Sequence, residues 1–343
     1  MKRIVPISIV LLIFAIALPL IVFRSSSEPE EAEVTEDPTE AAVTPQANFD
    51  FSAVAGEMDK SLTVTVWLDE AVCEMSMYEY LVGVVSAEMP VSFEPEALKA
   101  QAVAARTYTL YKMLGAANSN HPDAYVCGDY TCCKAYSSQA ALQEHWGEDY
   151  SSNMAIIAAA VSETDGMCIV YENAPILAAF HSSSAGHTEA SGNIWGDLPY
   201  LQSVQTFETD ENVPTFYSAV TLTYDEFKET ILAAYDTAVL EGEYSTWITD
   251  IVRSDSNRIT SINVGGVVIT GAEFRSLFSL RSTNIEIEFI DEGLTLSIEG
   301  YGHGVGMSQY GANVLAQVGL GYEQILTWYY TGVSLATMDT VLG

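Results

Sequence analysis

The first apolar run in the chain begins almost at its N-terminus. Twenty uncharged residues extend from Ile4 to Phe23, directly after Lys2 and Arg3. A helix of about 20 apolar residues is long enough to cross a bilayer, and the run lacks a good small-residue cleavage site. We therefore predict that residues 1–24 form an uncleaved membrane anchor. Because basic residues stay on the cytoplasmic side, the N-terminus is expected in the cytoplasm and the bulk of the chain outside the cell membrane.

The stretch after this run has the opposite character. Residues 25–60 contain few apolar side chains and many glutamates, prolines, threonines and alanines. Such a composition buries too little apolar surface to fold. We predict a disordered acidic linker that holds the folded part of the chain away from the membrane.

Beyond the linker, apolar positions recur with the periods of strands and helices. Residues 61–70 alternate between apolar and polar side chains, which is typical of a strand, whereas Tyr78, Leu81 and Val85 fall on one face of a helix. Residues 115–150 are polar and irregular. The pattern predicts helices over 75–89, 95–114 and 153–164, and paired strands over 167–171 and 175–182 with a turn at 172–173.

The pattern changes again after residue 204. We predict an amphipathic helix over 222–235, a hairpin followed by a helix over 258–278, and a second hairpin over 284–300. Strands and helices that mix without strict βαβ alternation indicate an α+β fold. We interpret residues 205–298 as a smaller α+β insertion in a catalytic core formed by residues 61–204 and 299–343.

The net charge restricts what the chain can bind. It has 13 lysines and arginines against 46 acidic residues, a formal charge of -33. Contacts with phosphate need basic side chains, so this composition argues against nucleic acid as a partner and against anionic lipid headgroups. A neutral or cationic ligand, such as a glycan, is compatible with it.

Glu88 differs from the other acidic residues in its surroundings. It follows an apolar run that includes Val84 and Val85, and it precedes Met89 and Pro90. At the C-terminal end of the predicted helix, the helix dipole and the apolar neighbours both favour a neutral carboxyl group. Such a group can donate a proton to a substrate. The alternative is a helix-end glutamate that binds nearby amides.

A second group of residues suits a metal ion. His121, Cys127, Cys132 and Cys133 lie close together in the irregular stretch. Thiolate and imidazole ligands are typical of tetrahedral zinc, although this spacing is not that of a zinc finger. A disulfide between Cys127 and either Cys132 or Cys133 is the alternative, favoured by an oxidising exterior. The odd total of five cysteines leaves at least one without an intramolecular partner.

The stretch FHSSSAGHTEASGNIWG, residues 180–196, combines His181 and His187 with several serines. A serine nucleophile paired with histidine is disfavoured, because the strand–turn–helix motif G-x-S-x-G is absent. We predict instead a polar loop that lines a cleft, with Ser183 and Thr188 in contact with substrate.

The stretch GYGHGVGMSQYGA, residues 300–312, has a glycine at every second position of its first half. Glycine lets the backbone approach another group closely. A phosphate-binding loop is disfavoured because no G-K-[ST] follows. His303, Gln309 and Tyr310 offer hydrogen bonds and a stacking face to a sugar, and a tight buried turn is the alternative.

Five stretches in this order resemble one family. From about Leu62 to Gly332, the chain is similar to the stage II sporulation protein D family, which includes the amidase enhancers. The segment GVVITGAEFRSLFSLRST of the insertion is similar as well. The five stretches are EYLVGVVSAEMP, PEALKAQAVAARTY, AAFHSSSAGHTEASGNIWG, PYLQSV and GHGVGMSQYGA.

The resemblance implies a function. Founding members of the family are membrane-anchored lytic transglycosylases, which cut peptidoglycan between N-acetylmuramic acid and N-acetylglucosamine during engulfment of the forespore. They favour glycan strands from which a partner amidase has removed the stem peptides. The resemblance therefore implies peptidoglycan strands as substrate, with a cell-wall amidase and other engulfment membrane proteins as partners.

The resemblance also implies roles for single residues. Glu88 matches the catalytic glutamate, which protonates the glycosidic oxygen and then accepts the proton of the C6 hydroxyl, giving a 1,6-anhydro sugar. Four further residues are expected to position the glycan or to stabilise charge: Arg106, His181, Gln309 and Tyr310.

For the metal, His121, Cys127 and Cys133 match the zinc ligands of sporulation members. The fourth ligand is Cys132, a water or none. Zinc is expected to be structural, and a metal-activated water is the alternative chemistry.

Two noncatalytic functions stay open. Amidase enhancers share these motifs and stimulate a separate amidase, and a glycan-binding anchor protein would need no reaction at all. The presence of Glu88 in its motif favours the enzyme.

Overall fold

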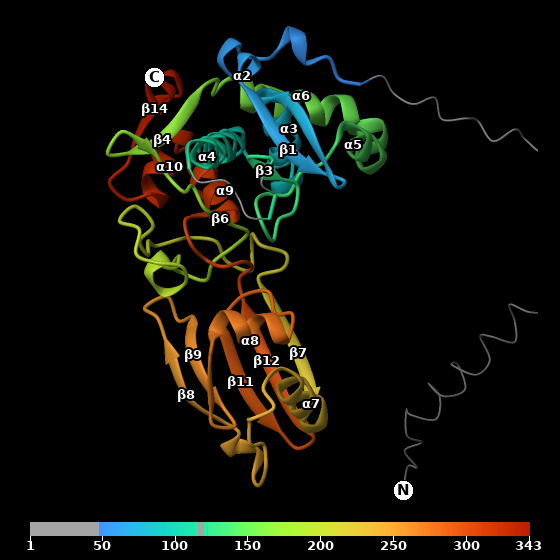
Figure 1. The fold of residues 1–343 in the computed structure, drawn as a ribbon, viewed down its shortest axis with the longest axis vertical. Helices are drawn as coiled ribbons and strands as arrows, with labels where there is room; N and C mark the ends of the chain where they lie inside the picture. Colours follow the sequence, from blue (N-terminus) through green and yellow to red (C-terminus); the bar gives the residue numbers. More distant parts are fainter. Residues whose placement is uncertain (1–47, 116–119, 122) are drawn as a thin grey trace, which may run out of the picture. The chain divides into compact units, whose positions relative to one another are not determined.

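The computed structural model describes residues 48–115, 120, 121 and 123–343 (Figure 1). The predicted anchor and the linker up to residue 47 lie outside these residues. Among the helices of the described part, none is long and apolar enough to cross a bilayer. Helices mix with parallel and antiparallel strands without βαβ alternation, which confirms the predicted α+β class.

A three-stranded sheet lies near the start of the described chain. The alternating residues form β1 (Thr63–Leu68), which confirms the predicted strand. A turn at Asp69 and Glu70, both with positive φ, leads into β2 (Ala71–Ser76), which pairs antiparallel with β1. The other edge of β1 pairs in parallel with β3 (Val126–Cys127), and this pairing fixes the position of the first cysteine of the predicted metal cluster.

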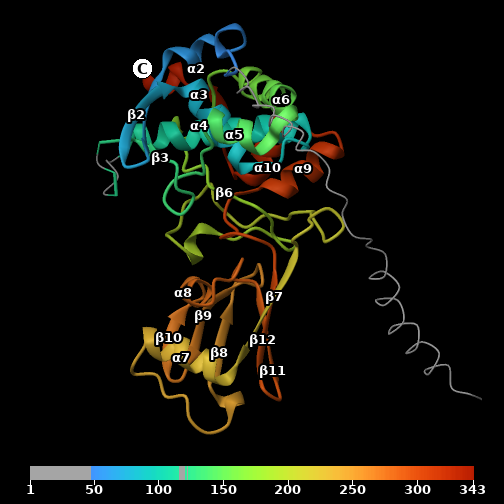
Figure 2. The ribbon, with the colours of Figure 1, turned by 90° about the vertical axis from the view of Figure 1, so that its right-hand side faces the viewer.

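The helices predicted from apolar periodicity are present. α3 (Met77–Glu88) begins at a capping box in which Ser76 and Glu79 satisfy each other's backbone N–H groups. α4 (Pro95–Leu114) begins with a proline, which is well tolerated in the first turn of a helix. It packs against α3 and α6 (Tyr150–Ser162), as Figures 1 and 2 show.

The stretch expected to be irregular contains a helix that was not predicted. α5 (Gln139–Trp146) lies in this stretch and is followed by the short helix η2 (Gly147–Asp149). Ser138 caps α5, but Leu142 is its one buried side chain. A helix that buries so little shows no apolar period in its sequence.

The serine-rich stretch pairs differently from our prediction. β4 (Met167–Tyr171) forms, and the turn after it is correct, but the second strand over 175–182 is wrong. Within residues 174–182, β5 (Ala174–Pro175) is the only part that pairs with β4, whereas β6 (Phe180–His181) pairs in parallel with β13 (Met307–Ser308). The partner of β6 is remote in sequence, so no local pattern reveals it. This pairing brings the serine-rich and glycine-rich stretches side by side.

The C-terminal elements complete the first part of the fold. β14 adds to the free edge of β4, and α9 and α10 pack against α4. The elements are α9 (Gln309–Gln317), α10 (Tyr322–Tyr329), β14 (Ser334–Thr337) and α11 (Asp339–Leu342).

The segment predicted to be an insertion forms two further sheets, with strand orders β10-β9-β8 and β11-β12-β7 (Figure 2). Both predicted hairpins are present, and β7 was missed because it ends where the predicted helix begins. The elements are β7 (Tyr217–Thr223), α7 (Tyr224–Ala234), η4 (Tyr244–Thr246), β8 (Ile248–Arg253), β9 (Ile259–Val264), β10 (Val267–Thr270), α8 (Gly271–Leu277), β11 (Ile285–Ile290) and β12 (Gly293–Glu299).

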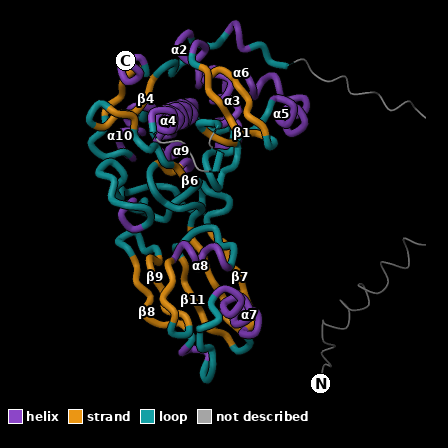
Figure 3. The backbone as a smooth tube through the Cα atoms, in the orientation of Figure 1, coloured by secondary structure: helices purple, strands orange, loops and turns teal. Residues whose placement is uncertain are grey.

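Apolar side chains form two separate buried clusters. One joins the helices around α4 to β1, β4 and the glycine-rich stretch, and the other lies between the strands and helices of residues 220–298. Between β6 and β7 the chain is mostly loop, with one short helix, η3 (Ser191–Asn193) (Figure 3). The boundaries of the insertion at 205 and 298 stay a prediction.

The linker prediction is wrong for residues 48–60. This segment forms η1 (Phe51–Ala53) and α2 (Glu57–Ser61), and its aromatic rings pack on the first cluster. Asp165 accepts the backbone N–H groups of Met58 and Asp59 over 3.1 and 2.9 Å. The acidic composition concealed a short helix that is fixed by tertiary contacts.

Arg106 does not have the predicted role. Its guanidinium is completely buried and forms two hydrogen bonds with Asp59 of α2, over 2.7 and 2.5 Å. It also donates to the carbonyl of Met167 over 3.0 Å. A glycan cannot reach this side chain, so Arg106 is a structural residue that joins α2, α4 and β4.

Breaking this ion pair should strongly destabilise the fold. Asp59→Ala leaves a buried guanidinium without a counter-charge, which costs about 3–5 kcal/mol. We expect that loss in the free energy of unfolding, measured by urea denaturation of the purified chain. Lys60→Ala, one residue away and exposed, should change it by less than about 0.5 kcal/mol. A loss below about 1 kcal/mol for Asp59→Ala would contradict this account.

Candidate functional site

Glu88 occupies the last position of α3, where Pro90 prevents the helix from continuing. Its side chain is half-buried. The backbone N–H of Ala135 donates to Oε1 over 3.0 Å, and Nε2 of Gln309 donates to Oε2 over 3.1 Å. Two polar donors contact the carboxylate, so its surroundings are more polar than the local sequence indicated. Donors from two remote segments thus fix the carboxylate.

Gln309 reaches Glu88 from the start of α9. Ser308 caps this helix by accepting the N–H of Gly311 over 3.2 Å. The Nε2 atom of Gln309 also lies 3.4 Å from Oε1 of Gln101, which is fully buried in α4. This contact turns the nitrogen end of the Gln309 amide toward the carboxylate. Gln101 was not predicted, although a lone amide among the buried alanines of α4 is a signal that could have identified it.

Lys134 is a second residue that the sequence reasoning missed. It is buried, and its ammonium group lies 3.5 Å from the ring centroid of Phe180 and 4.5 Å from that of Tyr108. Burial lowers the pKa of Lys134 to about 8, and the negative charge of Glu88 opposes this shift. A cation therefore lies within electrostatic reach of the candidate catalytic carboxylate.

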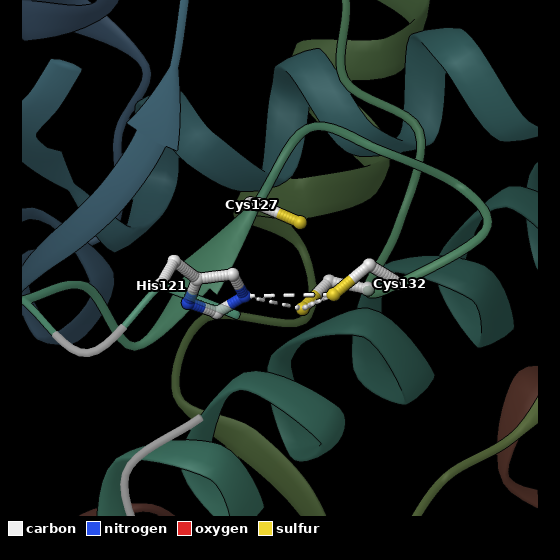
Figure 4. Close-up of side chains that lie close together, drawn as sticks. His121, Cys127 and Cys132 are labelled. Carbon is white, nitrogen blue, oxygen red and sulfur yellow. Dashed lines mark hydrogen bonds between the residues drawn. The ribbon is translucent and has the colours of Figure 1, made fainter. Parts of the chain in front are cut away.

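The four predicted metal ligands converge. The ligand atoms of His121, Cys127, Cys132 and Cys133 all lie within 4.8 Å of one another. Figure 4 shows the labelled side chains of His121, Cys127 and Cys132 directed toward one another. All but Cys132 are buried. The pairing of β3 with β1 and the turn at Asp129 bring these residues together.

The distances fit a tetrahedral zinc ion. Nε2 of His121 lies 3.3 Å from Sγ of Cys133 and 3.7 Å from Sγ of Cys132, and the two sulfurs are 4.0 Å apart. Zinc bonds of about 2.3 Å to sulfur and about 2.0 Å to nitrogen separate tetrahedral ligands by roughly 3.6–3.8 Å. Nδ1 of His121 lies 3.0 Å from the carbonyl of Ala124, which leaves Nε2 facing the sulfurs. The cysteines are unbridged.

A cavity of about 630 Å³ borders this cluster. Its lining includes the half-exposed Cys132 and the aromatic rings of Trp67 and Tyr136. The cluster is therefore approachable from one side.

Buried glutamates connect the loops around Glu88. Glu208 accepts the backbone N–H of Ser184 over 2.7 Å and the hydroxyl of Ser308 over 2.5 Å. Glu189 accepts the hydroxyl of Ser254, in the insertion, over 2.5 Å. Because Ser308 also caps α9, Glu208 fixes the residue that precedes Gln309.

The glycine-rich stretch runs closely against the serine-rich one. Gly304 and Gly306 have φ of 85° and 75°, a region that favours glycine. A Cβ atom on Gly306 would lie 2.0 Å from the carbonyl oxygen of Ala179. The glycines thus allow the two backbones to approach each other closely. For Gly304 and Gly306, the structure therefore agrees with the alternative reading of the motif as a tight buried turn.

Three predicted substrate contacts of the serine-rich stretch are buried. Nε2 of His181 lies 2.6 Å from the hydroxyl of Ser184, and burial lowers the pKa of His181 well below its ordinary value. The hydroxyl of Thr188 accepts the backbone N–H of Val204 over 2.9 Å. Ser183 is fully buried. This geometry contradicts the predicted contacts of His181, Ser183 and Thr188 with substrate, because all three side chains are buried.

His303 and Tyr310 are more accessible. Both are half-buried. The ring of His303 lies 4.9 Å from that of Trp195, and the ring of Tyr310 lies 5.0 Å from that of Phe93. Their contact with substrate stays a prediction.

Comparisons with known proteins identify the family. The model of the stage II sporulation protein family matches residues 69–171, which include Glu88 and the metal cluster. The chain is 35% identical over 278 residues to stage II sporulation protein D of Bacillus amyloliquefaciens, covering 80% of this chain and 78% of the relative. It is 32% identical over 283 residues to that of Bacillus subtilis (strain 168), covering 82% and 80%.

A further relative carries a different name. The amidase enhancer of Bacillus subtilis (strain 168) is 29% identical over 305 residues, which are 75% of this chain and 40% of the relative. The two sporulation relatives exceed 30% identity across most of both chains. The chain therefore belongs to the stage II sporulation protein D family.

Proposed function

We propose that this protein is a peptidoglycan lytic transglycosylase that cleaves the bond between N-acetylmuramic acid and N-acetylglucosamine in peptide-stripped strands. The observation that carries the proposal is the position of Glu88. Donors from the metal loop and from the glycine-rich stretch converge on its carboxylate. Local structure alone does not require such an arrangement around a helix-end glutamate.

In the first step, protonated Glu88 donates its proton to the glycosidic oxygen, and the bond from this oxygen to the anomeric carbon breaks. The carboxyl group becomes a carboxylate. The N–H groups of Ala135 and Gln309 then stabilise the negative charge that appears on its oxygens, and the Lys134 charge acts in the same direction.

In the second step, the Glu88 carboxylate accepts the proton of the C6 hydroxyl of the same muramic acid residue. The C6 oxygen forms a bond to the anomeric carbon, and Glu88 returns to its protonated state. The product is a 1,6-anhydro sugar, and no water is consumed. One carboxyl group suffices, unlike in glycosidases that use two. The buried Glu189 and Glu208 already accept hydrogen bonds from hydroxyl and amide groups of the loops.

Zinc, held by His121, Cys127, Cys132 and Cys133, is part of the proposal. Its role would be structural, because four protein ligands leave no position for a water. The last of these ligands, Cys133, directly precedes Lys134 and Ala135. Closing the metal loop would keep the Ala135 N–H directed at Glu88.

We further propose that the N-terminal apolar run anchors the protein in the cell membrane, with the described residues outside. There it would act during engulfment, together with an amidase that strips the strands and with other membrane proteins.

A noncatalytic activator of a cell-wall amidase is the second candidate. The similarity to a protein named amidase enhancer favours it. It requires glycan binding but no proton transfer by Glu88. Analysis of the products of strand cleavage separates the two functions.

The catalytic role predicts the effect of Glu88→Gln. General acid–base groups contribute about 10²–10⁴-fold to rates, so the variant should lose at least about a hundredfold in the cleavage of peptide-free strands. Mass spectrometry of wild-type digests should show anhydro ends, one water lighter than hydrolysis products. Glu94→Gln, an exposed glutamate nearby, should cleave like the wild type.

Reducing ends instead of anhydro ends would identify a hydrolase. If the folded wild-type protein leaves strands uncut but stimulates an amidase, the activator replaces the enzyme as the proposed function.

The zinc proposal predicts metal content and its consequence. Elemental analysis should find about one zinc per chain in the wild type and in Cys73→Ser, a cysteine outside the cluster. Cys133→Ser should retain much less and unfold at a lower temperature, because metal binding contributes to folding. Metal-free wild-type protein with a disulfide from Cys127 to Cys132 or Cys133 would favour the alternative.

A further inference from the structure

Positive charge is scarce in this chain, yet two half-buried arginines of the insertion have no ion pair. Acidic side chains number 46 and basic ones 13, so each cation should find a carboxylate easily. Lys99, Arg106 and Arg253 do so. The other described cations have no carboxylate within ion-pair distance, and among them Arg275 and Arg281 are the two arginines that are only half-buried. An anion from outside would supply the missing partner.

Both arginines lie near the glycine-rich stretch, because the N–H of Gly302 donates to the carbonyl of Arg281 over 2.8 Å, and Nε of Arg275 donates to the carbonyl of the preceding residue, Leu280. The guanidinium carbon of Arg281 lies 5.5 Å from the ring centroid of Tyr301, and the charge of Arg275 acts on Tyr301 and His303. Each guanidinium group donates one N–H to a backbone carbonyl, over 3.0 Å from Arg275 and 3.4 Å from Arg281. In the described part of the chain, their other N–H groups have no hydrogen-bond acceptor. Donors are therefore available to a ligand.

Exposed aromatic rings lie beside these donors. Tyr301 is 43% and Trp195 is 51% exposed, large values for such apolar side chains. The Trp195 ring packs at 4.9 Å from the ring of His303, which follows Tyr301 by two residues. We call Trp195, Tyr301, Arg275 and Arg281 the aromatic–guanidinium surface.

This surface is connected to the candidate catalytic residue. The N–H of Ala135 donates to Glu88, and the ammonium group of the neighbouring Lys134 lies 3.5 Å from the ring centroid of Phe180. The next residue, His181, has its ring 5.7 Å from that of His303, which contacts Trp195. A linear polymer whose scissile bond is at Glu88 can therefore extend toward the aromatic–guanidinium surface.

We propose that the aromatic–guanidinium surface is a subsite for a sugar that carries a free carboxylate, with Arg281 and Arg275 binding the carboxylate and Trp195 and Tyr301 packing on the ring. The inference rests on the proposed function for its choice of glycan. In peptidoglycan, the lactyl group of muramic acid has a free carboxylate only where the stem peptide is absent. The subsite thus recognises stripped strands directly.

The chemistry favours this occupant over a neutral glycan. Guanidinium groups bind carboxylates through paired charge-assisted hydrogen bonds. The chain as a whole, with its charge of -33, repels an anionic polymer. Unpaired arginines beside aromatic rings offset that repulsion at one place. A neutral sugar could pack on the aromatic rings but would have no use for the two arginines.

The test compares two forms of the same polymer. Peptide-free strands are used as prepared and after conversion of their carboxylates to methylamides. Binding to the full chain with Glu88→Gln, which prevents turnover, is measured by titration calorimetry at low salt. We expect the carboxylate form to bind about tenfold or more tightly, the contribution of one charged hydrogen-bonded pair. The difference should shrink at high salt.

Substitutions identify the residues that cause this difference in affinity. In the Glu88→Gln background, Arg281→Gln should remove most of the difference in affinity between the carboxylate and methylamide strands. Its affinity for the methylamide strands should be unchanged. Arg281→Lys should restore part of the difference, because a lysine keeps the charge without the planar fork. Lys228→Gln removes a cation elsewhere on the insertion. In the same background, it should show the same difference in affinity between the two strand forms as the Glu88→Gln parent. Arg275→Gln is the second variant if Arg281→Gln unfolds.

Equal binding of the two strand forms by the parent would overturn the inference. So would discrimination that survives both Arg281→Gln and Arg275→Gln. These outcomes are independent of catalysis. Discrimination without cleavage by the wild type would support the subsite and reject the transglycosylase, whereas cleavage without discrimination would reject the subsite alone.

Discussion

The hydrogen bonds that fix Glu88 depend on segments that are far apart in the chain. Helix α3 presents the carboxylate, the metal loop supplies the N–H of Ala135, and α9 supplies the amide of Gln309. Each donor has its own support. The cluster around His121 determines the course of the loop, and Glu208 holds Ser308 at the start of α9. Loss of any of these supports would displace a donor without touching Glu88.

The sequence predicted the parts of this site that depend on local chemistry. A glutamate between apolar residues and a proline, a histidine near three cysteines, and a loop rich in glycine are each visible in one stretch. Apolar periods likewise predicted α3, α4 and both hairpins of the insertion. Such features are encoded by neighbours in sequence, so they do not require knowledge of the fold.

The predictions failed where tertiary contacts determine the role of a side chain or the partner of a strand. Arg106 and His181 look available in the sequence, but burial and their partners Asp59 and Ser184 make them structural. Lys134 was overlooked because its importance lies in its distance from Glu88 and not in its local motif. The pairing of β6 with β13 could not be predicted either, since two residues on each strand contain too little pattern. Polar side chains are thus the hardest to assign from sequence.

The ion pair between α2 and α4 determines where the folded unit can be separated from the preceding chain. A protease that cuts before α2 leaves Asp59 with its arginine, and the released fragment keeps a paired guanidinium. A cut after α2 removes the carboxylate and leaves the arginine buried alone. Shedding of an intact fragment is therefore restricted to cleavage on the N-terminal side of residue 57, although the apolar pattern of the fold begins only at β1.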